Sequence, residues 1–289
     1  MILAIVGPTG VGKTKLSVEL AKKYNAVIIN ADAMQVYIGM DIGTAKIKEK
    51  EKEGISHYLF DIKDVNVNYT VYDYQKDVRE LIEKYKDRNI IFVGGSGLYL
   101  KAALYDYQFN EEEKTVNTYD ELSNDELYEL ALKKDAKMTI HKNNRKRLIR
   151  FLNKESIDIP AAKPLYDAIY IGLTCDRNIL YERINNRVDE MFQEGLIEEV
   201  KNFYDKKINS KALSTAIGYK ELFLYFNGEI TLEEAKDLIK KNSRHYAKRQ
   251  YTWFKNQMDI TWFNVDFENF NNTIEEVEKY ISKNTNKIK

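Results

Sequence analysis

A glycine-rich stretch near the beginning of the chain constrains its fold more than any other feature. Residues 7–14 read GPTGVGKT and fit the pattern G-x-x-x-x-G-K-T. An apolar run at residues 2–6 precedes the stretch, and an amphipathic segment follows it as far as Tyr24. A strand, a glycine-rich turn and a helix in this order are typical of a phosphate-binding loop. The sequence therefore predicts an α/β fold built on a parallel sheet.

The residue types of this loop suit a diphosphate or triphosphate group. Glycines allow consecutive backbone N–H groups to approach phosphate oxygens closely, and the N-terminus of the following helix attracts an anion. Lysine adds a compact, mobile charge, while a threonine hydroxyl can hold a Mg²⁺ ion that bridges to the phosphates. The alternative is a glycine-rich helix start that binds nothing. We expect diphosphate to bind to Gly7, Pro8, Thr9, Gly10, Val11, Gly12, Lys13 and Thr14, and magnesium to bind at Thr14.

Composition restricts the class of protein. With 289 residues, of which 44% are hydrophobic, the chain is long enough for a sizeable core. Its single cysteine excludes an internal disulfide framework and a cysteine metal cage. The chain enters a strand directly, and no apolar run approaches the length of a membrane span, so we expect a cytoplasmic protein. The 45 basic and 45 acidic residues cancel, so any basic surface must be local.

The segments that follow the loop continue the pattern of strands and helices. Further strands are expected at residues 26–30, 57–61, 90–93, 169–175 and 260–264. Helices are expected at residues 71–88, 124–153, 178–194, 218–226 and 231–255, and a last helix is expected to begin at a capping box on Thr273.

Residues 105–164 interrupt this pattern. They are first polar and acidic, then helical and basic, and they end in a segment at residues 157–164 that holds two of the three prolines and reads as a return connection. We therefore predict a P-loop NTPase-like parallel sheet flanked by helices, formed by residues 1–104 and 165–289, with a helical C-terminal region. Residues 105–164 are predicted to form an inserted, mainly helical subdomain.

One carboxylate is well placed for chemistry. Asp32 follows the second predicted strand, and ligands of doubly wound sheets bind beyond the carboxyl ends of the strands. Motor ATPases and GTPases place a magnesium-binding Asp after an apolar strand, but here the strand at 90–93 runs into Gly94 and Gly95. This weakens a nucleotide-switch function. We expect Asp32 to act as a general base, and its alternative role is that of a loop or helix-cap residue.

Two basic stretches could contact RNA. One lies at the end of the inserted segment, and the other lies on the long late helix, where aromatic residues are interleaved with it. Basic clusters are also common on solvated helix faces, which is the alternative here. The stretches consist of Lys142, Arg145, Lys146, Arg147 and Arg150, and of Lys240, Lys241, Arg244, Lys248 and Arg249.

Several stretches together carry a resemblance to a known family. They read GPTGVGKT at 7–14, DAMQVY at 32–37, GMDIGTAK at 39–46, VGGSGLY at 93–99, IGYKE at 217–221 and AKRQYTWF at 247–254. With these stretches in this order, the chain resembles the tRNA dimethylallyltransferases, also called tRNA isopentenyltransferases. The stretches at 32–46 and 247–254 are far more specific to that family than the phosphate loop.

The resemblance implies transfer of a dimethylallyl group from dimethylallyl diphosphate to the N6 amine of the adenosine that lies 3′ of the tRNA anticodon. The phosphate loop would then bind the leaving diphosphate, with Lys13 and a Mg²⁺ ion at Thr14 stabilising its charge, and Asp32 would be the general base. The acceptor base would be flipped into the site, and a monomer would bind the anticodon stem–loop. The tRNA-binding residues that the resemblance implies are Asp32, Ala33, Met34, Gln35, Ser96, Lys146, Arg147, Leu148, Ile149, Arg150, Arg244, Lys248, Arg249 and Gln250.

The chain also departs from the family pattern. The inserted segment is shorter than usual, no arginine occurs between Arg88 and Arg145, and Thr215 stands where some members carry an arginine. Three other functions stay open: an adenylate isopentenyltransferase, a small-molecule P-loop kinase and a non-catalytic RNA-binding protein. The insertion and the basic late helix favour tRNA over a free nucleotide, and the intact Lys13, Thr14 and Asp32 favour an enzyme.

Overall fold

The computed structural model describes residues 1–109, 119–153 and 163–285. They fall into two compact units, one formed by residues 1–105 and 164–289 and the other by residues 106–163. Most of the predicted return connection, residues 157–164, lies outside the described residues. No described helix is both long and apolar enough to cross a membrane.

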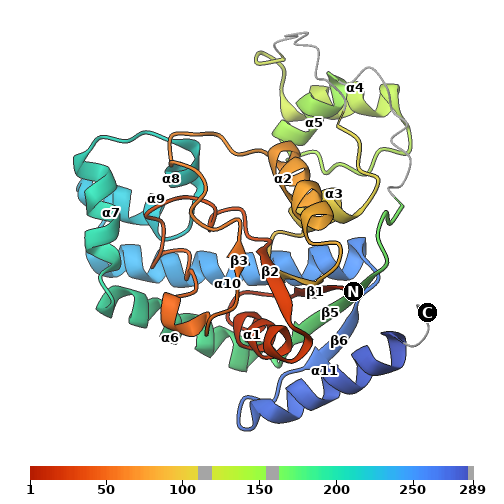
Figure 1. Cartoon of the computed structure of the whole chain (residues 1–289). Coiled ribbons are helices and arrows are strands. Elements are labelled where there is room, and N and C mark those ends of the chain that lie inside the picture. Colours follow the sequence, from red (N-terminus) through yellow and green to blue (C-terminus); the bar gives the residue numbers. More distant parts are fainter. Residues whose placement is uncertain (110–118, 154–162, 286–289) are drawn as a thin grey trace. The chain divides into compact units, whose positions relative to one another are not determined.

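The first unit contains a six-stranded sheet in the order β3-β2-β4-β1-β5-β6, and its strand pairs are all parallel (Figure 1). The strands are β1 Ile2–Val6, β2 Ala26–Asn30, β3 His57–Tyr58, β4 Asn89–Gly94, β5 Ala168–Thr174 and β6 Thr261–Asn264. The predicted parallel sheet is therefore confirmed, although β3 is shorter than the strand predicted over residues 57–61. Because β1 lies between β4 and β5, the loop that follows it opens at the middle of the carboxyl edge of the sheet.

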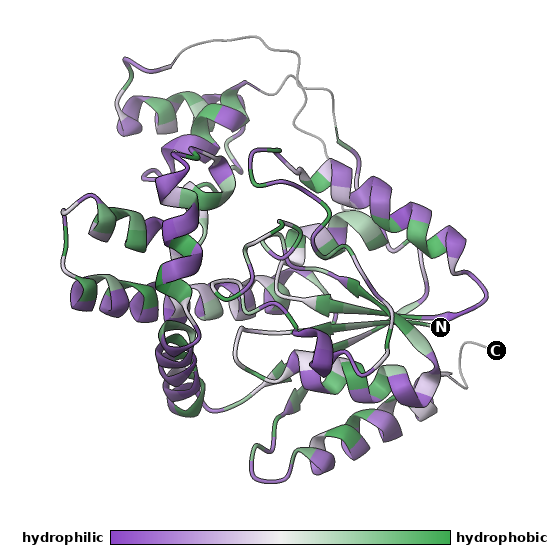
Figure 2. Ribbon diagram, turned by 60° about the vertical axis from the view of Figure 1, so that its left-hand side comes forward, coloured by the Kyte–Doolittle hydropathy of each residue, from purple (hydrophilic) through white to green (hydrophobic). Residues whose placement is uncertain are grey.

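Helices cover both faces of this sheet. Figure 1 shows α1 (Lys13–Tyr24) and α11 (Phe270–Thr285) on one side of it, and α2 (Val71–Lys84) and α3 (Gly97–Leu104) on the other. Strands that are buried on both faces are apolar throughout, as the green strands of Figure 2 illustrate. The core beneath α1 and α11 contains alternate residues of the strands, among them Leu3, Ile5, Ile28, Ile91, Ile171 and Leu173. Helices packed on both faces of the sheet therefore hold the carboxyl ends of its strands in place, and the site lies at these ends.

The remaining described helices of this unit lie between strands in the chain. The 3₁₀ turn η1 (Glu49–Glu51) lies between β2 and β3. Five helices lie between β5 and β6, and they are α6 (Arg177–Gln193), α7 (Leu196–Asp205), α8 (Lys211–Thr215), α9 (Tyr219–Phe226) and α10 (Leu232–Gln257). A capping box begins α10, since the Glu234 N–H donates to Thr231 Oγ1 at 3.2 Å and the Thr231 N–H donates to Glu234 Oε2 at 2.7 Å. This cap helps to fix the helix that carries the late basic stretch.

The predicted start of the last helix is wrong. α11 begins at Phe270, and Thr273 lies within it, only 1% exposed. The Thr273 hydroxyl oxygen accepts a hydrogen bond from the Asp266 N–H at 2.9 Å. The Asp266 Oδ1 in turn accepts from the Glu268 and Asn269 N–H groups at 3.0 and 2.8 Å. Asp266 therefore orders the turn that leads into the helix, and Thr273 joins that turn to the helix interior.

The second unit contains two helices among its described residues, α4 (Asn124–Lys134) and α5 (Arg145–Leu152). The single helix predicted over residues 124–153 is therefore wrong. The chain leaves the helix at Asp135, whose side-chain oxygen accepts a hydrogen bond from the Lys137 N–H at 2.8 Å, as in many turns. Leu127, Ala131 and Leu148 form the small core between the two helices.

Candidate active site

The loop between β1 and α1 has a conformation that depends on glycine. Gly12, with φ of 98°, is the N-cap of α1, and a Cβ there would lie 2.8 Å from the Phe270 ring in addition to being strained. The Lys13 amine folds back and donates to the Pro8 carbonyl oxygen at 2.8 Å. Burial lowers the pKa of Lys13 to about 8, while the Asp32 carboxylate acts in the opposite direction. The protein's own contacts hold the loop in this conformation. A negatively charged ligand beside Lys13 would favour the protonated form of its amine.

A cavity of about 270 Å³ lies beside this loop. Its polar wall includes Lys13 and Thr14 from the start of α1, Asp32 and Gln35 from the segment after β2, and Arg187 from α6. Its apolar wall is formed by Val93, Ile184, Val188, Met191, Ala216, Ile217 and Ile239. A larger cleft of about 1220 Å³ shares Lys13, Thr14 and Arg187 with the cavity, so the phosphate loop lies where the two spaces meet.

Asp32 lies just beyond the carboxyl end of β2 and lines the cavity. The Met34 N–H donates to Asp32 Oδ1 at 3.0 Å, and the Asp32 N–H donates to Asn30 Oδ1 at 2.9 Å. Burial raises the pKa of Asp32, whereas the Met34 N–H and the nearby Lys13 and Arg187 charges favour its ionised form. A carboxylate with a raised pKa accepts a proton more readily than a solvated one. The position and the environment of Asp32 both suit a general base.

Arg187 is a site residue that the sequence analysis does not single out. Its Nη1 donates to Thr9 Oγ1 at 3.3 Å, and its Nη2 donates to the Ala45 carbonyl oxygen at 3.5 Å. Burial lowers its pKa, while the nearby carboxylates of Glu190 and Asp32 counteract that effect. One turn earlier on α6, Arg183 Nε donates to the Gly10 carbonyl oxygen at 3.1 Å, so two arginines brace the phosphate loop. The signal in the sequence is their four-residue spacing on a helix that follows a central strand.

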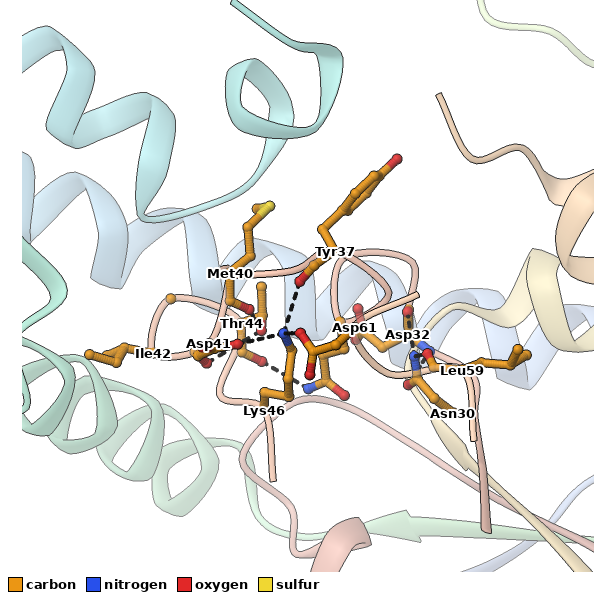
Figure 3. A network of polar contacts seen from close by, with 12 residues as sticks. Asn30, Asp32, Tyr37, Met40, Asp41, Ile42, Thr44, Lys46, Leu59 and Asp61 are labelled. Atoms are coloured by element: carbon orange, nitrogen blue, oxygen red, sulfur yellow. Dashed lines mark hydrogen bonds and ion pairs between the residues drawn. The ribbon is translucent and has the colours of Figure 1, made fainter. Parts of the chain in front are cut away.

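Lys46 holds the segment at residues 39–46 in place. Its amine donates to the Tyr37 carbonyl oxygen at 2.8 Å and to the carboxylates of Asp41 and Asp61 at 2.5 Å each. Figure 3 shows the amine between these three oxygens. It also shows Asn30, the last residue of β2, and Asp32, which lies just beyond that strand. Only 6% of the Lys46 side chain is exposed, whereas about half of each partner carboxylate is exposed, 57% for Asp41 and 48% for Asp61. Lys46 therefore fastens the segment instead of presenting a free charge to a ligand.

Glu199 of α7 anchors the same segment from another element. Its carboxylate accepts hydrogen bonds from the N–H groups of Asp41, Ile42 and Gly43 at 3.0, 2.7 and 3.0 Å. The Tyr219 hydroxyl donates to it as well, at 2.5 Å. Three successive amides around one carboxylate form an anion nest that is already occupied by the protein. This anchor holds the loop that carries the Ala45 carbonyl, the partner of Arg187.

Three residues predicted to bind tRNA have protein partners in the site. Gln250 is 5% exposed, and its Oε1 accepts from the Thr9 N–H at 2.9 Å. The Gln250 Nε2 donates to the Gly95 carbonyl oxygen at 3.2 Å, and a Cβ at Gly95 would lie 1.9 Å from this amide. The other two residues are Ser96, which accepts from the Ala33 N–H at 3.0 Å, and Gln35, which donates to the Thr44 carbonyl oxygen at 2.9 Å. Their contact with RNA stays a prediction.

The basic residues of α10 differ in their surroundings. Arg244 Nη1 donates to Asn185 Oδ1 at 2.5 Å, and the Lys240 amine donates to Asp189 at 2.9 Å. Arg249 lies over the Tyr246 ring at 5.6 Å, and both residues line the cavity. Lys248 is exposed. α10 therefore extends from the cavity to the surface, as an RNA-contacting helix would have to do.

The basic helix of the second unit is partly structural. Leu148 is 0% exposed and its side chain packs in the core of the unit, and its contact with RNA stays a prediction. Ile149 is partly buried against the same core. Arg145 Nη2 donates to the carbonyl oxygens of Tyr119 and Asp120 at 2.8 and 3.0 Å, which ties α5 to the segment before α4. The exposed cations of this helix are Lys146, Arg147 and Arg150.

The chemistry of the site fits a magnesium ion that is held mainly by a phosphate ligand. In the part of the chain that the structure describes, no group of three or more His, Cys, Asp or Glu side chains lies together as a metal cage. Mg²⁺ at phosphate sites takes one or two protein oxygens, substrate phosphates and several waters. Thr14 is exposed and lines both the cavity and the cleft, so its hydroxyl can supply the protein oxygen.

The chain is similar to known proteins over nearly its whole length. A family model described as IPP transferase matches residues 35–257. The tRNA dimethylallyltransferase of Enterococcus faecalis is 47% identical over 91% of this chain and 91% of its own length. That of Anoxybacillus flavithermus is 44% identical over 97% of this chain and 96% of its own length.

Solved structures agree with these matches. The full-length tRNA isopentenylpyrophosphate transferase of Bacillus halodurans is 42% identical, with a TM-score of 0.77 over 98% of this chain and 95% of that one. A eukaryotic dimethylallyltransferase, described as acting on tRNA, is 25% identical, with a TM-score of 0.83 over 100% of this chain and 80% of that one.

Proposed function

The chain belongs to the IPP transferase family of tRNA dimethylallyltransferases, and we propose that it transfers the dimethylallyl group of dimethylallyl diphosphate to the N6 amine of the adenosine 3′ of the anticodon. Diphosphate is released. The observation that carries this proposal is the presence of Lys13, Arg187 and Asp32 on the wall of one cavity. Two cations suit a leaving diphosphate, a carboxylate suits an incoming amine, and the apolar wall suits a short branched hydrocarbon chain.

Charge builds up on the leaving group as the allylic C–O bond breaks, because the bonding electron pair goes to the diphosphate oxygen. Lys13 and the N–H groups of the phosphate loop stabilise this charge. Arg187, already hydrogen-bonded to Thr9, supplies a second cation. Thr215, at the position where some members carry an arginine, donates its hydroxyl hydrogen to the Lys211 carbonyl oxygen at 2.6 Å and adds no charge. When bound at Thr14, Mg²⁺ would neutralise part of the diphosphate charge.

Asp32 acts on the nucleophile. The amine of adenine is a weak nucleophile because its lone pair is delocalised into the ring. As N6 forms its bond to the allylic carbon, the nitrogen acquires a positive charge and must lose a proton. The Asp32 carboxylate accepts that proton, and its raised pKa makes it a competent base. The products are the prenylated adenosine, diphosphate and a proton on Asp32.

The acceptor is proposed to be a base of tRNA and not a free nucleotide. A base in the anticodon loop must leave its stack to reach a cavity, and Ala33, Met34 and Gln35 are proposed to line its entry. Exposed cations are proposed to hold the RNA backbone, and they are Lys146, Arg147 and Arg150 of the inserted unit and Lys248 and Arg249 of α10. The partly buried Arg244 of α10 is proposed to contact the RNA as well. We further propose that the inserted unit serves as the tRNA-binding subdomain of a monomeric enzyme.

The test uses the purified chain with dimethylallyl diphosphate and Mg²⁺. The acceptors are an unmodified anticodon stem–loop RNA and AMP, and the products are identified by mass. We expect the RNA to gain one dimethylallyl group on the adenosine next to the anticodon, and AMP to stay unmodified. Prenylated AMP without prenylated RNA would instead indicate an adenylate isopentenyltransferase. A parallel assay replaces dimethylallyl diphosphate by ATP, and phosphoryl transfer to a small acceptor there, with no prenyl transfer in the first assay, would indicate a kinase.

A further inference from the structure

Tyr246 of α10 lines the cavity, and none of the roles proposed above uses it. α10 directs one row of side chains toward this cavity, which consists of Ile239, Ser243, Tyr246 and Gln250. Successive members of the row are three or four residues apart, which is the spacing of a single helix face. Tyr246 lies in the middle of this face and is partly exposed. A molecule that enters the cavity can therefore reach the tyrosine ring.

The residues around Tyr246 belong to the part of the site that is proposed to receive the acceptor base. Burial and the nearby Asp32 charge raise the pKa of the Tyr246 hydroxyl, while hydrogen bonding by Ser96 and Gln250 acts in the opposite direction. Ser96 Oγ also accepts a hydrogen bond from the Ala33 N–H at 3.0 Å, and Ala33 is proposed to line the entry of the base. A neutral phenol does not take up the proton that Asp32 is proposed to accept. Tyr246 thus adds an aromatic ring, and not a second base, beside Asp32.

A nucleotide fits this place better than the prenyl donor does. Bases that are flipped out of a nucleic-acid stack are held by stacking on aromatic side chains. The prenyl donor has no flat ring, and its diphosphate is attracted to the phosphate loop. Arg249 lies over the Tyr246 ring at 5.6 Å and also lines the cavity. The two residues together offer an aromatic surface to a base and a cation to its phosphate.

We propose that Tyr246 is a substrate-contacting residue whose ring packs against the flipped acceptor adenine and holds its N6 amine toward Asp32. This inference rests on the proposed function. Tyr246 then orients the base, and Asp32 removes the proton. Because the flat ring makes the contact, phenylalanine can replace the tyrosine, whereas leucine, which is apolar but not flat, cannot.

The experiment measures whether the contribution of Tyr246 depends on the acceptor base. Two anticodon stem–loop RNAs are compared, one unmodified and one that lacks the base of the adenosine next to the anticodon. Their affinities for the wild type, Tyr246→Leu and Tyr246→Phe are measured without the prenyl donor, so that no turnover occurs. Tyr251→Leu is the matched control, because Tyr251 lies on the same helix and packs against Trp262 of β6 at 4.9 Å. Thermal unfolding shows whether each variant folds, and Tyr246→Met replaces Tyr246→Leu if that variant does not.

We expect Tyr246→Leu to weaken binding of the unmodified RNA by about fivefold to tenfold, which is the lower part of the range for a base stacked on an aromatic ring. The same variant should bind the RNA without the base within about twofold of the wild type, because the partner of the ring is missing. Tyr246→Phe and Tyr251→Leu should bind both RNAs as the wild type does. A tyrosine that only supports the fold would not produce a loss that depends on the base.

Four results would each overturn the inference. Equal losses for both RNAs would indicate a role in the fold or in binding the RNA backbone, and losses below about twofold for both RNAs would indicate no contact. A loss in Tyr246→Phe as large as that in Tyr246→Leu would place the contact at the hydroxyl group, and an equal base-dependent loss in Tyr251→Leu would show that the effect is not specific to the cavity. Mass analysis of the RNA product judges the proposed function separately. A wild type that prenylates the RNA but gives one of these four results loses only this inference, whereas a wild type that leaves the RNA unmodified overturns the proposed function as well.

Discussion

Two sets of cations in this molecule are built in different ways. Lys13 and Arg187 line the cavity and hold fixed protein partners, whereas Lys146, Arg147 and Lys248 are exposed on helices. A charge in a partly buried site acts through a low dielectric and is screened little by salt. Exposed charges are screened and act together. From this difference we expect burial, and not the residue type, to decide which cations act on the chemical step and which act on RNA affinity.

The largest effect is expected at Asp32, the carboxylate that lies close to the buried cations Lys13 and Arg187. Asp32→Asn keeps the size of the side chain but removes the base, so we expect single-turnover prenyl transfer to fall by about 10²- to 10⁴-fold. Diphosphate affinity should stay the same or increase, because a negative charge near the phosphate loop is lost. Rapid-quench assays and diphosphate titrations measure the two quantities. An unchanged single-turnover rate would remove Asp32 from the mechanism.

Arg187→Met tests the buried cation that the sequence analysis missed. We expect kcat to fall by about 10²- to 10³-fold, as for the loss of one preorganised group at a developing anion, and Arg187→Lys to recover part of it. Arg177→Met is the matched control, because Arg177 lies exposed on the same helix and stacks on Tyr181 at 5.0 Å. Equal losses in Arg187→Met and Arg177→Met would contradict the distinction between buried and exposed cations.

The same distinction extends to carboxylates on α7. Glu199 is partly buried and accepts three backbone amides and the Tyr219 hydroxyl, whereas the adjacent Glu198 is exposed. Glu199→Ala should lower the free energy of unfolding by about 2–3 kcal/mol, because several amides lose a charged partner. Glu198→Ala should change it by less than about 0.5 kcal/mol. Urea denaturation of both variants measures the difference, and similar values would show that the loop needs no anchor.

Buried charges should also make the enzyme sensitive to pH. Lys13 must be protonated to bind diphosphate, and its pKa of about 8 means that kcat/KM for dimethylallyl diphosphate should fall as pH rises above about 8. Asp32 must be ionised, so kcat/KM should also fall as pH drops through its pKa, which burial raises. Each limb approaches a tenfold change per pH unit, since one proton is involved. In Asp32→Asn the acidic limb should disappear from the residual rate while the alkaline limb persists. Profiles at constant ionic strength decide this.

The sequence predicts best what is encoded locally. The phosphate loop and Asp32 lie at the ends of neighbouring buried strands, so motif and topology together place them in one site. Arg187 and Thr9 are 178 residues apart in the chain, and only the packing of α6 against the loop brings them together.

At two positions the local sequence pattern does not indicate the surroundings that the residue has in the folded chain. The Thr-x-Glu-Glu pattern at Thr273 predicts a helix cap. The helix instead begins earlier, at Phe270, directly after the turn that Asp266 orders. Leu148 stands among basic residues, but the helical period turns it inward, toward Leu127. Local patterns do not reveal which side of a helix the rest of the fold covers.

The smallest effect per residue is expected from the exposed cations. Replacing Lys146 and Arg147 together by Gln should weaken binding of the anticodon stem–loop and reduce the slope of log Kd against log salt by up to about 1.5, the value for two lost phosphate contacts. Arg145 is left in place, because its guanidinium holds the carbonyl groups of Tyr119 and Asp120 and its loss would disturb the unit itself.

The matched control replaces Lys279 and Lys283 by Gln. Both are exposed on α11, beyond the residues that match the family model. This pair changes the net charge by the same amount, so a general electrostatic effect would appear in both variants, whereas loss of specific phosphate contacts would appear only in the first. Prenyl transfer at saturating RNA should stay within about twofold of the wild type in either variant, because screened surface charges contribute little to the chemical step. Equal slopes in the two variants would mean that α5 is a solvated helix face and that the buried cations act without help from the inserted unit.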